Sequence, residues 1–279
     1  MNAIRPKKRF GQHFLKDRQY IKVILDAARL STDDVVLEIG PGTGVLTGEL
    51  VTRAGHVVAV EIDRELAAFL KERFASFSNL EVICADILTL SLTDILGFAI
   101  KKGRRCKVVA NLPYYITTPV IAALLNKREL FELLVVMVQE EVADRMVAQP
   151  GTKEYGAFSI MVQFYSEAEV MAHVPRGAFH PVPKVNSAVV RLKLRARPAV
   201  SVVSEAVFFD VVRAGFGKRR KMLRNALLGS DLGLCPGRVD KAFDIAGIPP
   251  TRRAEQLTLE EFGRLADALI CGCLKGDNN

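Results

Sequence analysis

The sequence has no long hydrophobic run. Its longest apolar stretches, 120–125 and 133–138 among them, reach six residues, whereas a helix needs about 20 apolar residues to cross a bilayer. The basic N-terminal residues are not followed by the apolar core of a secretory signal. We therefore predict a cytoplasmic protein without a membrane-spanning segment.

Cysteine and histidine are few and scattered. The 279 residues include five cysteines and four histidines, and no two cysteines have the C-x-x-C spacing. This excludes the usual zinc and thioredoxin-like motifs, which need paired cysteines. The sequence predicts reduced thiols and no metal site. Internal repeats and low-complexity segments are also absent.

Acidic residues are outnumbered, which gives a net charge of +8. The excess lies in two segments, 1–20 and 213–224, which carry six basic side chains each and only one acid, Asp17. The rest of the chain is slightly acidic. This distribution indicates a polyanion contacted at two places, although two solvated basic faces would leave the same pattern.

Between residues 35 and 139, β-branched apolar segments alternate with helical patterns. This alternation predicts an α/β fold, a doubly wound and mostly parallel sheet with helices on both faces. The segment 187–194 alternates apolar and polar residues, which predicts an antiparallel edge strand. The other predicted strands are 35–40, 56–62, 80–86, 106–112 and 133–139, and the predicted helices are 45–54 and 64–75.

A change of character near 195–204 predicts a linker, and only helical patterns follow it. Thr258 and Glu261 have capping-box spacing, and Gly229 and Gly247 mark helix ends. We expect a small all-helical C-terminal domain at 198–279 after a larger domain at 1–197. Its predicted helices are 205–216, 218–228, 237–247 and 257–270.

A glycine-rich loop follows the first strand of the α/β region, in the segment 38–44 (EIGPGTG). Glycine lets a backbone turn tightly and approach a ligand. The dinucleotide pattern G-x-G-x-x-G would need glycine where the sequence has Val45. Glu61 ends the next strand, where a carboxylate can bind both hydroxyls of a ribose. The G-x-G-x-G loop preceded by an acid, Glu38, instead resembles the first motif of S-adenosylmethionine methyltransferases. A methyltransferase cofactor loop is therefore favoured over a nicotinamide site or structural glycines.

Two further strand ends carry candidate site residues. Asp86 can accept a hydrogen bond from an adenine amino group, or can be an ordinary turn aspartate. In the loop NLPYY, the amide oxygen of Asn111 and the carbonyl of Leu112 can orient an amine, and Tyr114 offers an aromatic face. Such a loop suits methyl transfer to an exocyclic adenine amine, which requires an unpaired or flipped base.

The segment 179–190 (FHPVPKVNSAVV) is a predicted second wall of this site. Phe179 could stack on the opposite face of the base, or could be an ordinary core residue. Lys184 could meet a phosphate. Pro181 and Pro183 stiffen the segment.

Seven motifs occur together in one order and resemble the ribosomal RNA adenine dimethyltransferase family from Arg9 to about Ala268. They are 10–15 (FGQHFL), 38–44, 58–63 (VAVEID), 84–88 (CADIL), 111–115, 179–190 and 216–227 (FGKRRKMLRNAL). The sequence departs from the common family pattern at two positions. His13 stands where asparagine is frequent, and Tyr115 replaces a second asparagine in the NLPYN form.

The resemblance implies a Rossmann-like methyltransferase domain that uses S-adenosyl-L-methionine and methylates the target amine twice. The residues it assigns to the cofactor are His13, Leu15, Gly40, Glu61, Asp86 and Asn111. Those it assigns to the target adenine are Asn111, Leu112, Tyr114 and, opposite, Phe179. The basic residues expected to grip RNA are Lys218, Arg219, Arg220, Lys221 and Arg224, together with the N-terminal arm.

Within the family, the segment 252–262 (RRAEQLTLEEF) is similar to the branch that modifies two adjacent adenosines near the 3′ end of 16S rRNA. We expect a monomer that acts on 16S rRNA in the assembling 30S subunit. The alternatives are the 23S rRNA branch of the macrolide-resistance type, a nicotinamide-dependent oxidoreductase, and a non-catalytic factor that only clamps rRNA.

Overall fold

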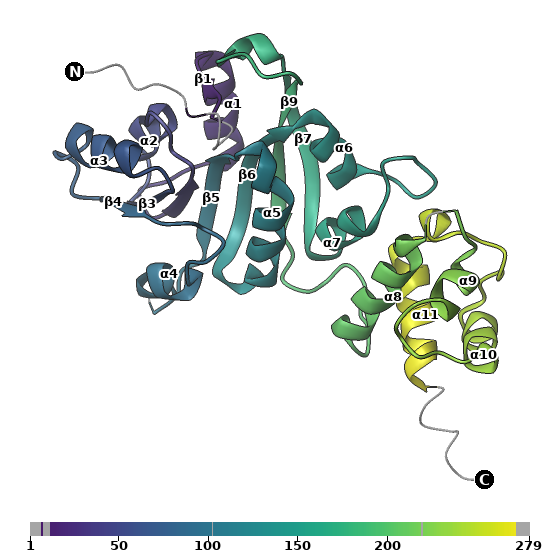
Figure 1. Cartoon of the computed structure of the whole chain (residues 1–279). Coiled ribbons are helices and arrows are strands. Elements are labelled where there is room, and N and C mark those ends of the chain that lie inside the picture. Colours follow the sequence, from purple (N-terminus) through teal and green to yellow (C-terminus); the bar gives the residue numbers. More distant parts are fainter. Residues whose placement is uncertain (1–6, 8–11, 102, 219, 272–279) are drawn as a thin grey trace. The chain divides into compact units, whose positions relative to one another are not determined.

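The computed structural model describes residue 7 and the ranges 12–101, 103–218 and 220–271 (Figure 1). The chain divides into two compact units, Met1–Ala143 with Glu167–Leu194, and Asp144–Ser166 with Arg195–Asn279. The strands are β1 (Phe14–Leu15), β2 (Val35–Ile39), β3 (His56–Glu61), β4 (Leu80–Cys84), β5 (Cys106–Asn111), β6 (Phe131–Gln139), β7 (Ser166–Val174), β8 (Phe179–His180) and β9 (Ser187–Leu194). The helices are α1 (Arg18–Ala28), α2 (Val45–Leu50), α3 (Arg64–Arg73), α4 (Leu92–Ile100), α5 (Thr117–Asn126), α6 (Glu140–Val147), α7 (Ala157–Tyr165), α8 (Glu205–Gly217), α9 (Leu223–Leu228), α10 (Pro236–Ala246) and α11 (Leu259–Cys271).

The first unit is built on a seven-stranded sheet with the order β4-β3-β2-β5-β6-β9-β7. The pairs among β4, β3, β2, β5 and β6 are parallel, and β9 runs antiparallel to β6. Every residue of β2 is buried, as expected for a strand covered on both faces. Helices flank the sheet (Figure 1). The predicted α/β fold is confirmed.

One strand assignment was wrong in its position and one strand was missed. The segment 187–194 does pair antiparallel with β6, but it is not at the edge of the sheet. The edge is β7, at residues 166–174. That segment, SEAEVMAHV, alternates in burial but has few β-branched residues, so its sequence gives a weak strand signal.

The strand order reverses at β2. From β2 the chain builds β3 and β4 on one side, and then returns to place β5 and β6 on the other side. In an open parallel sheet, such a reversal leaves a crevice beyond the carboxyl ends of the two central strands, and ligands bind there. The topology therefore directs attention to the loops that follow β2 and β5.

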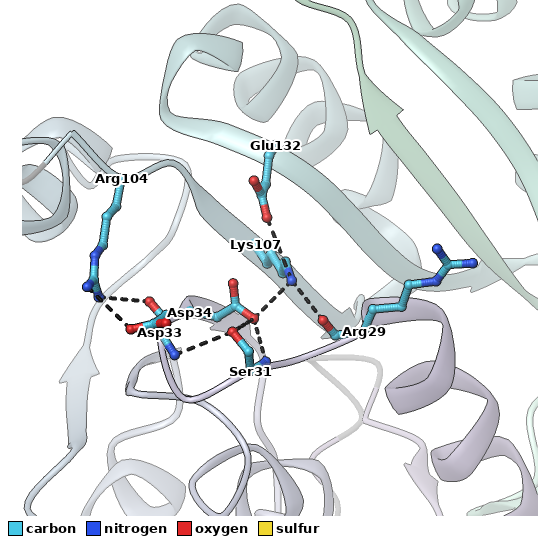
Figure 2. Close-up of polar contacts among 7 residues, drawn as sticks. All are labelled: Arg29, Ser31, Asp33, Asp34, Arg104, Lys107 and Glu132. Carbon is cyan, nitrogen blue, oxygen red and sulfur yellow. Dashed lines mark hydrogen bonds and ion pairs between the residues drawn. The ribbon is translucent and has the colours of Figure 1, made fainter.

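At the opposite end of these strands, Lys107 joins β5 to the turn before β2 (Figure 2). The Lys107 ammonium donates to the Arg29 carbonyl and to Asp34 Oδ2, both at 2.9 Å, and lies 3.6 Å from Glu132. Asp34 Oδ2 also accepts from the Ser31 backbone N–H at 2.6 Å. This network holds the amino ends of the two strands whose carboxyl ends form the crevice.

The second unit is helical, but it includes a segment that the sequence did not assign to it. Residues 144–166 group with 195–279, because the aromatic residues of α7 pack on α8. Phe164 stacks on Phe208 with ring centroids 4.6 Å apart, and Tyr155 donates to the Leu257 carbonyl at 3.0 Å.

The predicted helix ends of the second unit agree closely with the structure, apart from α9. The Thr258–Glu261 capping box forms in both directions, at 2.9 and 3.3 Å. Gly247 ends α10 in the left-handed conformation, with φ +66°. However, α9 begins only at Leu223, so Lys218, Arg220 and Lys221 precede the helix, and the Lys221 N–H closes a turn onto the Lys218 carbonyl.

Candidate active site

A cavity opens beyond the carboxyl ends of β2, β3, β4 and β5. Together with the solvent space of its open mouth, it takes in about 1050 Å³. The loop after each of these strands contributes to its lining, and residues 12–15 at β1 form one wall. All of the predicted cofactor and amine residues line it, namely His13, Leu15, Gly40, Glu61, Asp86, Asn111, Leu112 and Tyr114.

The glycine-rich loop after β2 has the backbone conformation that its sequence predicts. Gly40 and Gly44 have positive φ values of +67° and +78°, where a side chain would be strained. A Cβ at Gly44 would also stand 2.6 Å from side-chain atoms of Leu70 and Phe74. A Cβ at Gly40 would meet the Pro113 ring at 3.5 Å. The loops after β2 and β5 thus lie against one another.

Glu61 holds the glycine-rich loop in place from the neighbouring strand. Its two carboxylate oxygens accept from the backbone N–H groups of Gly42, at 3.1 Å, and Asp63, at 2.9 Å. Burial raises its pKa, and these backbone hydrogen bonds oppose that shift. Each oxygen keeps further acceptor capacity, so binding of a ribose by Glu61 stays a prediction.

Glu38 is the most unusual charged group of the cavity. Its side chain is 1% exposed, and its Oε2 has no hydrogen-bond partner within the part of the chain that the structure describes. Burial raises the pKa of Glu38 to about 8; the hydroxyl and backbone N–H of Thr47, which face the carboxyl, oppose this shift, and nearby Glu61 adds to it. The sequence showed this residue only as the acid before the glycines. A buried carboxyl with an unused oxygen fits a cationic ligand.

The Asn111 side chain is oriented by the residue opposite. Its Nδ2 donates to the His13 carbonyl at 3.3 Å. Because the amide nitrogen is held there, the amide oxygen is the atom left to accept from a ligand. The Leu112 carbonyl likewise accepts no hydrogen bond from any described residue. Two acceptors from consecutive residues are therefore available at the end of β5.

Tyr114 is held at its hydroxyl and on its ring. Its hydroxyl lies 2.7 Å from Ser187 Oγ, a buried atom at the start of β9. The His13 imidazole stacks on its ring, with centroids 5.7 Å apart and planes 23° from parallel. His13 Nδ1 donates to the Pro181 carbonyl at 2.8 Å. His13 therefore links the NLPYY loop to the 179–190 segment, a role that its sequence position did not reveal.

Two predicted cofactor residues also have local structural roles. Asp86 lines the cavity, and its Oδ1 accepts from the Leu88 backbone N–H at 2.9 Å, so the turn interpretation holds alongside the ligand interpretation. Leu15 is buried in the core and pairs with Phe179 across β1 and β8. Contact of Asp86 with adenine stays a prediction.

Phe179 does not face the cavity in this structure. It is 2% exposed, packs in the hydrophobic core of the first unit, and is absent from the cavity lining. Pairing of β8 with β1 turns its ring inward. In this structure Phe179 is therefore a core residue, and its ring does not form a second aromatic wall of the cavity.

The predicted RNA-binding bases of the second unit fall into two groups. Lys218 Nζ donates to the Gly229 carbonyl at 2.6 Å and so caps α9. Arg224 forms a two-pronged ion pair with Asp240, which raises its pKa. Arg220 and Lys221 are exposed and have no side-chain partner among the described residues. Arg219 lies outside the described residues.

The N-terminal arm falls mostly outside the described residues, but Lys7 is placed. Its ammonium contacts Asp63 at 2.9 Å and Glu65 at 3.0 Å. Asp63 caps α3 and also accepts from Gln12, which lines the cavity. Lys7 is therefore paired with the first turn of α3 beside the cavity.

A search of the described residues finds no helix able to cross a membrane and no group of three or more metal-ligating side chains.

Comparison with known proteins identifies the family. The model of the family described as "Ribosomal RNA adenine dimethylase" matches residues 3–270. This chain belongs to that family. It is similar to the ribosomal RNA small subunit methyltransferase A of Pelotomaculum thermopropionicum, with 48% identity covering 96% of this chain and 93% of the relative. The protein of the same name in Geobacillus thermodenitrificans is 46% identical, covering 95% and 91%.

Solved structures agree with this assignment. A dimethyladenosine transferase from Plasmodium falciparum has a TM-score of 0.73 at 27% identity, covering 91% of this chain and 96% of that one. The 23S rRNA methyltransferase ErmE has a TM-score of 0.69 at 32% identity, covering 92% and 99%. The family resemblance predicted from the motifs is confirmed. The chain is a methyltransferase with S-adenosyl-L-methionine as its cofactor, and a nicotinamide-dependent activity is not favoured.

Proposed function

We propose that the cavity holds S-adenosyl-L-methionine beside a single extruded adenine, and that Asn111 and Leu112 orient the adenine amine for two successive methylations. The product is dimethyladenosine in 16S rRNA, at two adjacent positions near its 3′ end. The observation that carries the proposal is the fixed Asn111 amide, whose nitrogen is held by the His13 carbonyl and whose oxygen is left for the substrate.

The residues of the cavity fit the cofactor. When bound, it supplies an activated methyl on a positively charged sulfonium. The buried Glu38 carboxyl with its unused oxygen suits a ligand that carries positive charge. Glu61 lines the cavity and would accept from the ribose hydroxyls, and the glycine-rich loop at Gly40 has no Cβ to keep its backbone from the ligand. Asp86 lies on the adjoining loop for the adenine amino group.

The chemistry required of the protein is orientation. An exocyclic adenine amine is a weak nucleophile, because its lone pair is delocalised into the ring. Two acceptors that take its N–H bonds favour a tetrahedral nitrogen and direct the lone pair toward the methyl. Positioning of this kind supplies several kcal/mol of a barrier, up to about 7–11 kcal/mol in ideal cases. The proton released after transfer passes to solvent.

The second methylation makes a stricter demand on the same residues. A mono-methylated amine has only one N–H left to donate, so either the Asn111 oxygen or the Leu112 carbonyl loses its partner. The flat base must still be held, and Tyr114 serves this purpose. Its ring orientation is fixed by the Ser187 hydroxyl and the His13 imidazole. With the adenine ring stacked on the fixed Tyr114 ring, the amine can rotate while the adenine ring stays in place.

The small-subunit target is favoured over the 23S target by the relatives. The curated relatives at 43–48% identity carry the small-subunit name, whereas ErmE is 32% identical. We infer that the chain acts as a monomer in the cytoplasm, on 16S rRNA within the assembling 30S subunit, without a metal ion.

Mass spectrometry of rRNA tests the proposed function. Small subunits that lack the modification are incubated with the protein and S-adenosyl-L-methionine, and the digested 16S rRNA is analysed. We expect two adjacent dimethyladenosines. Methyl groups on 23S rRNA alone would support the rival branch. Tight subunit binding with no transferred methyl would support a non-catalytic clamp.

The two groups of bases in the second unit predict different mutant behaviour. Replacing Arg220 and Lys221 with glutamine should weaken rRNA binding and make its salt dependence shallower by about 1.4, or 0.7 for each lost phosphate contact. Arg224→Ala should mainly lower the melting temperature, because it leaves Asp240 without its partner. Filter binding at several salt concentrations and thermal unfolding separate the two effects. A shallower salt slope in Arg224→Ala at unchanged stability would contradict this division.

A further inference from the structure

The pairing of β1 with β8 joins two basic segments that lie far apart in the sequence. Phe14 is opposite His180, and Leu15 is opposite Phe179. The register continues on both sides, since the Lys16 N–H donates to the Ala178 carbonyl at 2.9 Å and His13 bonds the Pro181 carbonyl. The two segments are also neighbours in Figure 1. Residues on either side of 14–15 and 179–180 therefore belong to one two-stranded surface element.

This element carries an uncompensated positive charge, and we call its cationic side chains the basic ribbon. All of them are exposed, and none has a side-chain ion pair or hydrogen bond with the described residues. The acid between them, Asp17, uses Oδ1 to cap α1 through the Gln19 N–H at 2.9 Å. The basic ribbon consists of Lys16, Arg18, Arg176 and Lys184.

Elsewhere on the first unit, several arginines are paired with acids. Arg53 pairs with Glu49 at 2.6 Å, and Arg191 pairs with Glu169 at 2.5 Å. Paired surface charges attract a polyanion weakly, because their fields cancel at short range. The basic ribbon differs because none of its cations is paired with an acid among the described residues, and its positive charges outnumber the one carboxylate between them, Asp17.

The ribbon is also continuous with the active-site cavity. His13, Phe14 and Leu15 line the cavity, and Lys16 and Arg18 follow them directly along the chain. A polynucleotide whose adenine enters the cavity must pass its neighbouring phosphates over the rim. Phosphate contacts of this kind fix the register of a nucleic acid without reading its sequence.

We propose that the basic ribbon is a phosphate-docking surface of the catalytic unit, which holds the rRNA strand next to the target adenosine. This inference rests on the proposed function and adds a surface to it. The ribbon works together with Arg220 and Lys221 of the second unit but is chemically independent of them. It places the flanking backbone, while Asn111 and Leu112 orient the amine.

A triple variant tests the ribbon, with Lys16, Arg18 and Lys184 each changed to glutamine. The matched control changes Lys71, Lys101 and Lys127 to glutamine. These three exposed lysines lie at the C-terminal ends of α3, α4 and α5. In a strand–helix–strand sheet, these helix ends lie at the edge opposite the cavity. Both variants lose three positive charges, so net charge alone cannot distinguish them.

We expect the ribbon variant to bind unmodified small subunits about 10- to 100-fold more weakly near 150 mM salt, with a salt slope shallower by about two. The control should keep the wild-type slope to within about 0.5. The dissociation constant for S-adenosyl-L-methionine and the melting temperature should match wild type in both variants. These two readouts show that the cavity and the fold are intact.

Three outcomes would overturn the ribbon proposal. One is an unchanged salt slope in the ribbon variant, and another is an equal change in ribbon and control variants. The third is lost binding to vesicles of phosphatidylglycerol and phosphatidylcholine with rRNA affinity unchanged, which would make the ribbon a membrane-binding surface. Failure of the proposed function looks different, because the wild-type protein itself would then transfer no methyl to 16S rRNA.

Discussion

Asn111→Ala should lower the turnover number for methyl transfer about 100- to 1000-fold, as removal of one preorganised hydrogen-bonding group does in other enzymes. The lost oxygen acts on the amine as it becomes tetrahedral, so the effect falls mainly on turnover. The dissociation constant for S-adenosyl-L-methionine should rise far less, by about tenfold at most, through the lost hydrogen bond from Nδ2 to the His13 carbonyl at the cavity wall. Single-turnover transfer to unmodified subunits and calorimetric cofactor binding measure the two quantities.

Asn111→Asp is the matched control for this prediction. Aspartate keeps an acceptor oxygen but cannot donate to the His13 carbonyl, which now takes a hydrogen bond from Nδ2 at 3.3 Å. We expect turnover between that of wild type and Asn111→Ala, with a weaker hold on residues 12–15. Near-normal turnover in Asn111→Ala would show that the amide does not orient the amine.

The sequence predicted those parts of the site that depend on strand order. Parallel strands put their carboxyl ends at one edge of a sheet, so motifs after successive strands converge without any tertiary information. Gly40, Glu61, Asp86 and Asn111 each follow or end such a strand, and all four line one cavity. The capping box at Thr258 was predictable for a similar reason, because helix caps depend on neighbours three residues apart.

Features that depend on which side chains meet across the fold could not be predicted. Phe179 and Arg224 have residue types suited to stacking and to RNA binding. In the structure, Phe179 lies on the inward face of β8, and Arg224 forms an ion pair with Asp240. For the same reason, the sequence did not predict the hydrogen bond between the hydroxyls of Tyr114 and Ser187, which are 73 residues apart. The strand β7, which lies beside β9, was missed because its own composition, with few β-branched residues, gives a weak strand signal.

Glu38 predicts a dependence on pH of both stability and cofactor binding. Burial raises its pKa from 4.5 in the unfolded chain to about 8 in the folded protein. A raised folded-state pKa contributes stability that is fully present below pH 4.5 and is lost as the pH rises toward 8. Glu38→Gln removes this loss. At pH 8 the variant should be more stable than wild type by on the order of 4 kcal/mol, and near pH 4 the two should agree.

Cofactor binding should remove the proton from the Glu38 carboxyl. The positive charge of S-adenosyl-L-methionine favours the ionised carboxylate, so binding near pH 7 should release up to one proton from Glu38. Its affinity for wild type should therefore rise between pH 6 and pH 8, where the folded pKa of about 8 governs the titration. Calorimetry in buffers of different ionisation enthalpy counts the proton. S-adenosyl-L-homocysteine, which lacks the sulfonium charge, should release less, and Glu38→Gln should release none from this position. Equal proton release by Glu38→Gln and wild type would mean that Glu38 does not respond to the cofactor, and its unused oxygen would then have no part in binding the methyl donor.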